Sequence, residues 1–331
     1  MRIVFVGAGG VGGFYGGLIA AARSAEVAFL ARPGSAHLDA LRRDGLTVER
    51  DGGRDPVRVP HVEAASDARD LAPADLAVVG VKLSDTDAAL DAARPLVERG
   101  AAVVSLQNGV TKHDALRAAY GPRAAVLGGV AYVAAHLARP GVVAQTGPMA
   151  RLLVGSHDGA PDPRAEGLAA AARAAGVDAE VPPDIGRAVW EKFVFLVGLS
   201  GATASARLPI GPIRADPHAR ALLRGLMEEA AAVGRARGVA LPEDAVDAAM
   251  ARADAVSPAM TSSLHHDLEA GRPLEVAWLA GAVADLGRAL GVPTPTNAAV
   301  RAILSPRAAG KPPSAAPPAT RAVDAPLTPP E

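Results

Sequence analysis

The sequence of 331 residues contains no cysteine, which excludes disulfide bonds, thiolate metal sites and cysteine nucleophiles. Aromatic residues make up only 3% and the formal net charge is -1, so neither a nucleic acid nor an acidic membrane surface is an expected partner. No run approaches the roughly 20 apolar residues of a membrane span, and the first apolar run is too short for a signal-peptide core. We therefore expect a soluble, cytoplasmic protein.

The apolar pattern predicts an α/β fold in the first half of the chain. Short β-branched runs alternate with alanine-rich segments, as in a doubly wound parallel sheet of the Rossmann type. The expected buried strands are residues 3–6, 27–30, 76–81 and 102–106. Further strands are expected at 124–135, 142–147 and 151–155. The last two lie close enough in sequence to form a hairpin.

After about Pro182 the pattern becomes helical throughout, with long helices expected at 218–238 and 275–291. We divide the chain into an α/β Rossmann domain of residues 1–180 and an all-α domain of residues 181–304. The final segment, 305–331, is rich in proline and alanine and has no aromatic residue, so we expect a disordered tail.

A glycine loop follows the first predicted strand. Gly7, Gly9 and Gly12 have the G-x-G-x-x-G spacing between that strand and a predicted helix, which is typical of dinucleotide binding. Gly7 would permit a tight turn, Gly9 would let the backbone approach a pyrophosphate, and Gly12 would let the helix pack closely. The alternative is a glycine-rich turn with no chemical role.

The end of the second predicted strand favours NADP over NAD. NAD-binding proteins carry an acidic residue about 20 positions past the loop, but residues 30–35 here read LARPGS. Arg32 is suited to a 2'-phosphate, with Ser35 able to donate a further hydrogen bond. The alternative for Arg32 is a solvated surface cation.

Polar residues also end two other predicted strands. Lys82 follows the third, and Gln107 and Asn108 follow the fourth, where ligands bind in parallel sheets. Asn108 could hold the nicotinamide ribose or a substrate oxygen, or could simply form an Asn-Gly turn. Lys82 could equally be a surface residue. A fourth polar residue, Lys192, heads the apolar run 193–197, so its amine either reaches water or has a chemical task.

Together these segments resemble the ketopantoate reductase (2-dehydropantoate 2-reductase) family, whose members join an NADP-binding Rossmann domain to an all-helical domain. The resemblance extends to about Leu304 and rests on GAGGVGG, LARPGS, GVKLSD, LQNGV, VWEKF and TSSLHHDLEAGRPLEVAWLAG. It implies NADPH-dependent reduction of a 2-oxo acid to a 2-hydroxy acid, as in the conversion of ketopantoate to pantoate in pantothenate biosynthesis.

The resemblance also assigns roles residue by residue. The cofactor pyrophosphate falls on Gly7, Ala8, Gly9, Gly10, Val11 and Gly12, the 2'-phosphate on Arg32, and a backbone contact on Ala134. Lys82, Asn108 and Glu275 fall beside the nicotinamide end of the cofactor, and Ser263 beside the substrate carboxylate. Lys192 falls on the proton donor, where an ammonium stabilises the charge that grows on the substrate oxygen. Glu275, if close, would keep Lys192 charged and oriented.

The sequence departs from the family at three substrate contacts. Asparagines that many members carry four and eight residues after the lysine correspond to Leu196 and Ser200, and a third corresponds to Ile210. The expected substrate-binding residues are therefore Asn108, Lys192, Leu196, Ser200 and Ser263. Because lost hydrogen bonds weaken binding of a polar substrate, a bulkier or more apolar 2-oxo acid is an alternative to ketopantoate.

Two other functions stay open. One is a 3-hydroxyacid or 6-phosphogluconate dehydrogenase, although Phe195 and Leu196 stand where asparagine is usual. The other is a non-catalytic NADP-binding sensor. We expect no metal site, because the adjacent His265 and His266 would point in different directions on a helix. A homodimer is left open.

Overall fold

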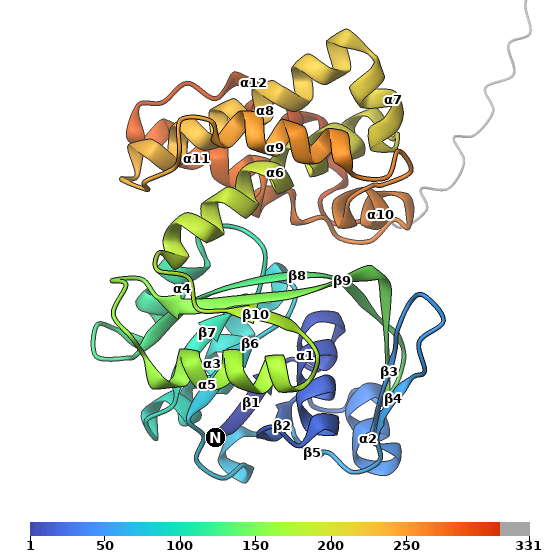
Figure 1. The fold of residues 1–331 in the computed structure, drawn as a ribbon, viewed down its shortest axis with the longest axis vertical. Helices are drawn as coiled ribbons and strands as arrows, with labels where there is room; N and C mark the ends of the chain where they lie inside the picture. The colour runs from blue at the N-terminus through green and yellow to red at the C-terminus, as the bar shows by residue number, and fades with distance from the viewer. Residues whose placement is uncertain (312–331) are drawn as a thin grey trace, which may run out of the picture.

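A large curved sheet and a bundle of helices stack on one another in the computed structural model, which describes residues 1–311 (Figure 1). The α/β part contains the N-terminus, and the helical part lies against one edge of it. The connection runs from β10 (Asp178–Glu180) to α6 (Ile185–Ala206). Among residues 1–311, none of the helices has the length and apolar character needed to cross a bilayer.

The core of the sheet is parallel, in the order β8-β7-β6-β1-β2-β5. Strand β1 pairs with β2 on one side and with β6 on the other, so the order of the strands reverses between β1 and β6. In parallel sheets, ligands bind beyond the carboxyl ends of the strands at this switch point. The strands are β1 (Arg2–Val6), β2 (Glu26–Leu30), β5 (Glu63–Ala65), β6 (Leu76–Val79), β7 (Ala102–Ser105) and β8 (Val126–Arg139).

One strand prediction is wrong. Residues 142–147 and 151–155 do not form a hairpin with each other but belong to one strand, β9 (Val142–Ser156), which pairs antiparallel with β8. The register shifts between the pairs Tyr132–Arg151 and Ala134–Thr146, so an irregularity in β9 accommodates Gly147 and Pro148, which read as a turn in the sequence. Strands β3 (Leu46–Glu49) and β4 (Val57–Val59), which were not predicted, extend the sheet beyond β9.

Helices cover both faces of the sheet. Successive residues of β1 alternate between two apolar clusters, with Ile3 and Phe5 in one and Val4 and Val6 in the other, as expected for a strand buried on both sides. Helix α1 begins at Gly10, inside the glycine loop rather than after it. The helices are α1 (Gly10–Ala22), α2 (Ala36–Asp44), α3 (Thr86–Glu98), α4 (Lys112–Tyr120) and α5 (Pro163–Ala174), with short 3₁₀ turns η1 (Ala68–Asp70) and η2 (Leu83–Asp85).

The C-terminal part packs around α6, whose central residues are buried against α8. The helix predicted at 275–291 is interrupted, because the backbone at Leu279 is not helical (φ -105°, ψ -104°) and separates a 3₁₀ turn from α11. The elements are α7 (Ile210–Ala215), α8 (Pro217–Ala236), α9 (Ala245–Ala255), α10 (Ser263–Glu269), η3 (Glu275–Trp278), α11 (Ala280–Leu290), α12 (Pro295–Leu304) and η4 (Ser305–Arg307).

The start of the predicted disordered tail is ordered. Residues 305–311 leave α12 through η4 and lie beside the loop before η3. The amide of Leu274 donates to the carbonyl of Ala308 at 2.8 Å, and the amide of Lys311 donates to the carbonyl of Gly271 at 3.0 Å. Backbone pairing therefore orders a segment that has few apolar side chains to bury. The rest of that tail, 312–331, lies outside the described residues.

Candidate active site

The glycine loop lies at the switch point, directly after β1. Gly7 has φ +97°, and a β-carbon there would lie 2.5 Å from Cγ1 of Val81, so the turn requires glycine. A β-carbon at Gly12 would run into the carbonyl oxygen of Gly7. By contrast, a β-carbon at Gly9 would meet nothing within 4 Å. Gly7 and Gly12 thus shape the loop, while Gly9 leaves open space in front of α1.

The N-terminus of α1 suits an anion. Its first turn holds no acidic residue, and no side chain in residues 1–311 caps it, so the positive end of the helix dipole is not neutralised locally. A β-carbon at Gly10 would collide with the backbone of Ala135 in β8, so β8 packs closely against the loop one residue after the exposed Ala134. Ala8 is buried and Val11 is half-buried, so these residues present mainly backbone.

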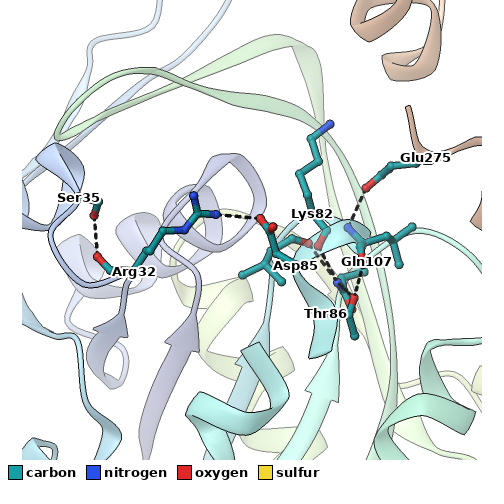
Figure 2. Close-up of polar contacts among 9 residues, drawn as sticks. Arg32, Ser35, Lys82, Asp85, Thr86, Gln107 and Glu275 are labelled. Atoms are coloured by element: carbon teal, nitrogen blue, oxygen red, sulfur yellow. Dashed lines mark hydrogen bonds and ion pairs between the residues drawn. The ribbon is translucent and has the colours of Figure 1, made fainter. Parts of the chain in front are cut away.

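Arg32 follows β2 and is largely exposed, with its guanidinium 3.1 Å from a carboxylate oxygen of Asp85 (Figure 2). Ser35, which the sequence predicts as a possible further donor to the 2'-phosphate, makes two local contacts in this structure. The Ser35 hydroxyl donates to the carbonyl of Arg32 at 2.8 Å and accepts from the amide of Leu38 at 3.2 Å. Ser35 therefore caps α2 and fixes the backbone that carries Arg32.

Lys82 connects the sheet to the helical domain. Its Nζ lies 2.7 Å from Oδ2 of Asp267 in α10, whose other oxygen accepts from Nε of Arg272 at 2.7 Å. The Asp267 side chain is only 8% exposed, whereas that of Lys82 is 56% exposed. In Figure 2 the Lys82 side chain extends away from the Arg32–Asp85 pair. A buried carboxylate thus anchors a lysine that keeps half of its surface accessible.

Glu275 makes a second contact between the domains. It begins η3, and its Oε1 accepts a hydrogen bond of 2.9 Å from the backbone amide of Leu83, just after Lys82 (Figure 2). No hydrogen bond joins Glu275 to Lys192 within residues 1–311, but the charge of Glu275 raises the pKa of Lys192. The two residues therefore interact through their charges and not through a hydrogen bond.

Lys192 lies in the second turn of α6 with its side chain half-buried. Its Nζ donates to Oδ1 of Asn108 at 2.8 Å and to the carbonyl of Ala131 at 2.7 Å, and it lies 5.5 Å from the ring centroid of Tyr132. Burial, and then the positive charge of Arg252, lower the pKa of Lys192 to about 8. A less basic lysine is a stronger acid.

Asn108 is positioned by the turn that ends β7. Gly109 has φ +85°, a conformation that glycine adopts without strain. The preceding residue, Gln107, is buried and its amide donates to Oγ1 of Thr86 at 2.8 Å and to the carbonyl of Val81 at 3.2 Å. Gln107, to which the sequence assigned no role, therefore ties the end of β7 to the end of β6 beneath Asn108.

Two basic residues near the site were missed from the sequence. Lys112, at the start of α4, is buried, and its Nζ donates to the carbonyls of Gln107 and Gly129, both at 2.6 Å. Burial, and then the charge of Lys192, hold the pKa of Lys112 well below its usual value. The other is Arg252 in α9. A lysine soon after an Asn-Gly turn, or an arginine in an alanine-rich helix, gives no recognisable signal in one sequence.

The residues predicted to bind the substrate differ in how far they are buried. Ser263 is exposed at the start of α10, next to Ser262, which caps that helix by accepting from the amide of His265 at 3.1 Å. Leu196 is half-buried, whereas Ser200 and Ile210 are fully buried. The Ser200 hydroxyl has no hydrogen-bond partner in the described part of the chain.

The adjacent histidines of α10 point to different partners. His265 contacts the carbonyl of Thr203 and His266 contacts Oγ1 of Thr261, both at 2.9 Å. Residues 1–311 contain no cluster of three or more histidine, aspartate or glutamate side chains able to hold a metal ion.

A parallel sheet with a glycine loop at its switch point is the arrangement of dinucleotide-binding oxidoreductases, and here Lys192 of the helical part meets the sheet at Asn108 and Ala131. Residues 3–159 match the family described as ketopantoate reductase PanE/ApbA, and residues 184–308 match its C-terminal domain. The chain belongs to the ketopantoate reductase family, and its fold and family membership make it an NADP-dependent oxidoreductase that acts on CH-OH groups.

Relatives match over nearly their whole length. The 2-dehydropantoate 2-reductase of Halobacterium salinarum is 37% identical, covering 87% of this chain and 92% of the relative. That of Mesorhizobium japonicum is 33% identical, covering 92% and 97%. The crystal structure of a PanE/ApbA family ketopantoate reductase from Ralstonia eutropha is 35% identical, with a TM-score of 0.81 and coverage of 93% and 98%. These matches agree with the fold, a mostly parallel sheet followed by helices.

Proposed function

We propose that this chain reduces ketopantoate, or a closely related 2-oxo acid, to the 2-hydroxy acid with NADPH, and that Lys192 is the proton donor. The proposal rests on the environment of Lys192. Its ammonium donates to Asn108 and to the Ala131 carbonyl, and its surroundings lower the pKa of Lys192 to about 8. The relatives named 2-dehydropantoate 2-reductase support this reaction class.

The residues at the switch point fit NADPH. Residues 7–12 would hold the pyrophosphate, since Gly9 leaves open space before an α1 terminus that has no acidic residue. Arg32 would bind the 2'-phosphate in place of its contact with Asp85, and Ala134 would contact the cofactor through its backbone. Lys82, Asn108 and Glu275 would lie beside the nicotinamide ribose. The bound cofactor supplies hydride to the carbonyl carbon.

Lys192 has one N–H left for the substrate. An ammonium carries three hydrogens, and those directed at Asn108 and Ala131 account for two. The third would point to the carbonyl oxygen, stabilise the negative charge that grows there, and then transfer as a proton. Asn108 would fix the direction of this N–H. Because the amine is a stronger acid than an ordinary lysine, the transfer has a lower barrier at neutral pH.

The decisive experiment follows NADPH absorbance with a panel of 2-oxo acids. Lys192→Met preserves the length of the side chain, and it should lower kcat by about 10² to 10⁴ while leaving the Kd for NADPH nearly unchanged. Retained turnover in this variant would remove Lys192 from the mechanism. If the unaltered protein binds NADPH but turns over no 2-oxo acid, the non-catalytic sensor becomes the better description.

A more apolar 2-oxo acid is the second candidate. Tyr132 lies beside the amine, and two further half-buried apolar residues, Phe195 and Leu196, follow Lys192 by about one helical turn on α6. Such a wall favours an apolar substrate side chain over hydroxyl groups. Equal kcat/KM for ketopantoate and for apolar 2-oxo acids would argue against this alternative. A role for Ser263 at the substrate carboxylate, and a homodimer, stay predictions.

A further inference from the structure

We propose that Arg252 is the substrate-binding residue that pairs with the carboxylate of the 2-oxo acid, beside the carbonyl oxygen on Lys192. This inference rests on the proposed function and adds to it a specific requirement, a charged carboxylate next to the reacting carbonyl.

Arg252 belongs to the same local structure as Lys192. Its guanidinium carbon lies 5.0 Å from the ring centroid of Phe195 and 5.2 Å from that of Tyr132. Phe195 is three residues after Lys192 on α6, and Tyr132 follows Ala131, whose carbonyl accepts from the Lys192 amine. The two aromatic rings thus hold the guanidinium of Arg252, and the Tyr132 ring is shared with the Lys192 amine, which lies 5.5 Å from its centroid.

Arg252 has no carboxylate partner among residues 1–311, although α9 carries acidic residues on either side of it. Asp254 pairs with Arg220 at 2.6 Å, and Asp247 pairs with Arg224 at 2.7 Å. Residue Arg252 is nevertheless half-buried. A partly desolvated cation next to a second cation is unfavourable unless an anion joins them.

The arrangement suits a carboxylate adjacent to a ketone. Arginine presents a planar fork that binds a carboxylate through two parallel hydrogen bonds, and it can do so while its face rests on aromatic rings. In a 2-oxo acid the carboxylate and the carbonyl are on neighbouring carbons. The carboxylate would therefore lie on Arg252 with the carbonyl oxygen on Lys192, and the side chain of the acid would face Leu196.

The test compares a charged substrate with a neutral one. For Arg252→Gln we expect KM for the 2-oxo acid to rise about 100-fold, because one partner of a charge pair is lost. KM for the corresponding 2-oxo amide should change little, and the Kd for NADPH should be unchanged. Added guanidinium ion should partly restore the activity of Arg252→Gln on the acid. The KM of Arg252→Lys for the acid should lie between that of the unaltered protein and that of Arg252→Gln. The matched control is Arg224→Gln, which removes an exposed arginine that also pairs with α9 and should leave KM unchanged.

Two results would overturn the inference: an unchanged KM for the acid in Arg252→Gln, or equal losses on acid and amide. If the unaltered protein reduces no 2-oxo acid, the proposed reaction fails and Arg252 is tested by binding instead. Calorimetry with oxamate and the NADP-bound protein should then show binding that Arg252→Gln abolishes and Arg252→Lys retains. Equal binding by all three proteins, or binding by none of them, would refute the role of Arg252.

Discussion

The Lys192 amine on α6 and the Asn108 amide oxygen after β7 are 2.8 Å apart, although 84 positions separate them in the chain. The proposed proton donor therefore belongs to the helical part, while the group proposed to orient it belongs to the sheet. The proposed proton transfer would depend on how these two parts meet.

Replacing Asn108 by alanine should mainly lower kcat, with a smaller effect on the free energy of unfolding. The Lys192 ammonium would keep the Ala131 carbonyl but lose its second acceptor, so its third N–H would no longer have a fixed direction. We expect kcat to fall by about 10- to 100-fold, since misdirected catalytic groups carry penalties of this order. Steady-state kinetics and thermal unfolding check this, and unchanged kcat would contradict it.

The pH dependence of kcat/KM should show a limb at about 8. The proposed acid, Lys192, is competent only when protonated, and the pKa of Lys192 in the free protein is about 8. Activity should therefore be full below that pH and fall about tenfold for each unit above it. Asn108→Asp would place a negative charge beside the amine, raise this pKa and move the limb upward. A limb that does not move would assign it to another group.

Two glycine substitutions should separate cofactor binding from folding. Gly9→Ala introduces a methyl group into open space at φ -72°, so unfolding free energy should change by about 1 kcal/mol or less. If the pyrophosphate occupies that space, the Kd for NADPH should rise about tenfold or more.

Gly7→Ala is the contrasting variant, because φ is +97° and the new β-carbon would lie 2.5 Å from Val81. It should destabilise the fold by about 1 to 3 kcal/mol or more. Urea unfolding and fluorescence titration with NADPH measure both effects. Equal NADPH affinity for Gly9→Ala and the unaltered protein would remove the loop from the pyrophosphate site.

Lys112 should make stability fall as the pH is lowered. The pKa of Lys112 in the folded protein is well below its usual value, so on descending from about pH 10.4 the unfolded chain takes up a proton that the folded protein does not. Lys112→Met lacks this proton uptake, although it also loses two hydrogen bonds to carbonyls.

The difference in unfolding free energy between Lys112→Met and the unaltered protein should therefore shift in favour of the variant from pH 10 to pH 7. Urea unfolding across this range measures it. A constant difference would mean that Lys112 keeps an ordinary pKa in the fold.

The parts of the site that were predictable are those with a local pattern. The loop at residues 7–12 combines the glycine spacing with a strand before it and a helix that begins within it, and this local order was enough to predict a dinucleotide-binding loop. Lys192 stands out because an ammonium heads the apolar run 193–197, but this pattern alone left open whether the amine reaches water, and its role as proton donor came from the family resemblance. Each of these signals lies within a few residues of the group concerned.

Most of the parts that were missed depend on contacts between distant segments. The Ser35 hydroxyl accepts from the amide of Leu38 as a helix cap and donates to the Arg32 carbonyl, two local contacts that the sequence did not predict. The strand at 142–156 continues through Gly147 because β8 supplies a partner on both sides of the irregularity. Arg252 becomes notable only when α9 packs against α6 and brings it to the rings of Phe195 and Tyr132.

The contact between Glu275 and position 83 determines which substitutions the junction between the sheet and the helical part can accept during evolution. Glu275 accepts from the main-chain amide of residue 83, not from its side chain. Every amino acid except proline supplies that donor. Substitutions at position 83 can therefore alter the buried surface at this junction while the Glu275 carboxylate keeps its hydrogen bond. Replacement of Glu275 would instead remove this contact between the sheet and the helical part, whichever residue occupies position 83.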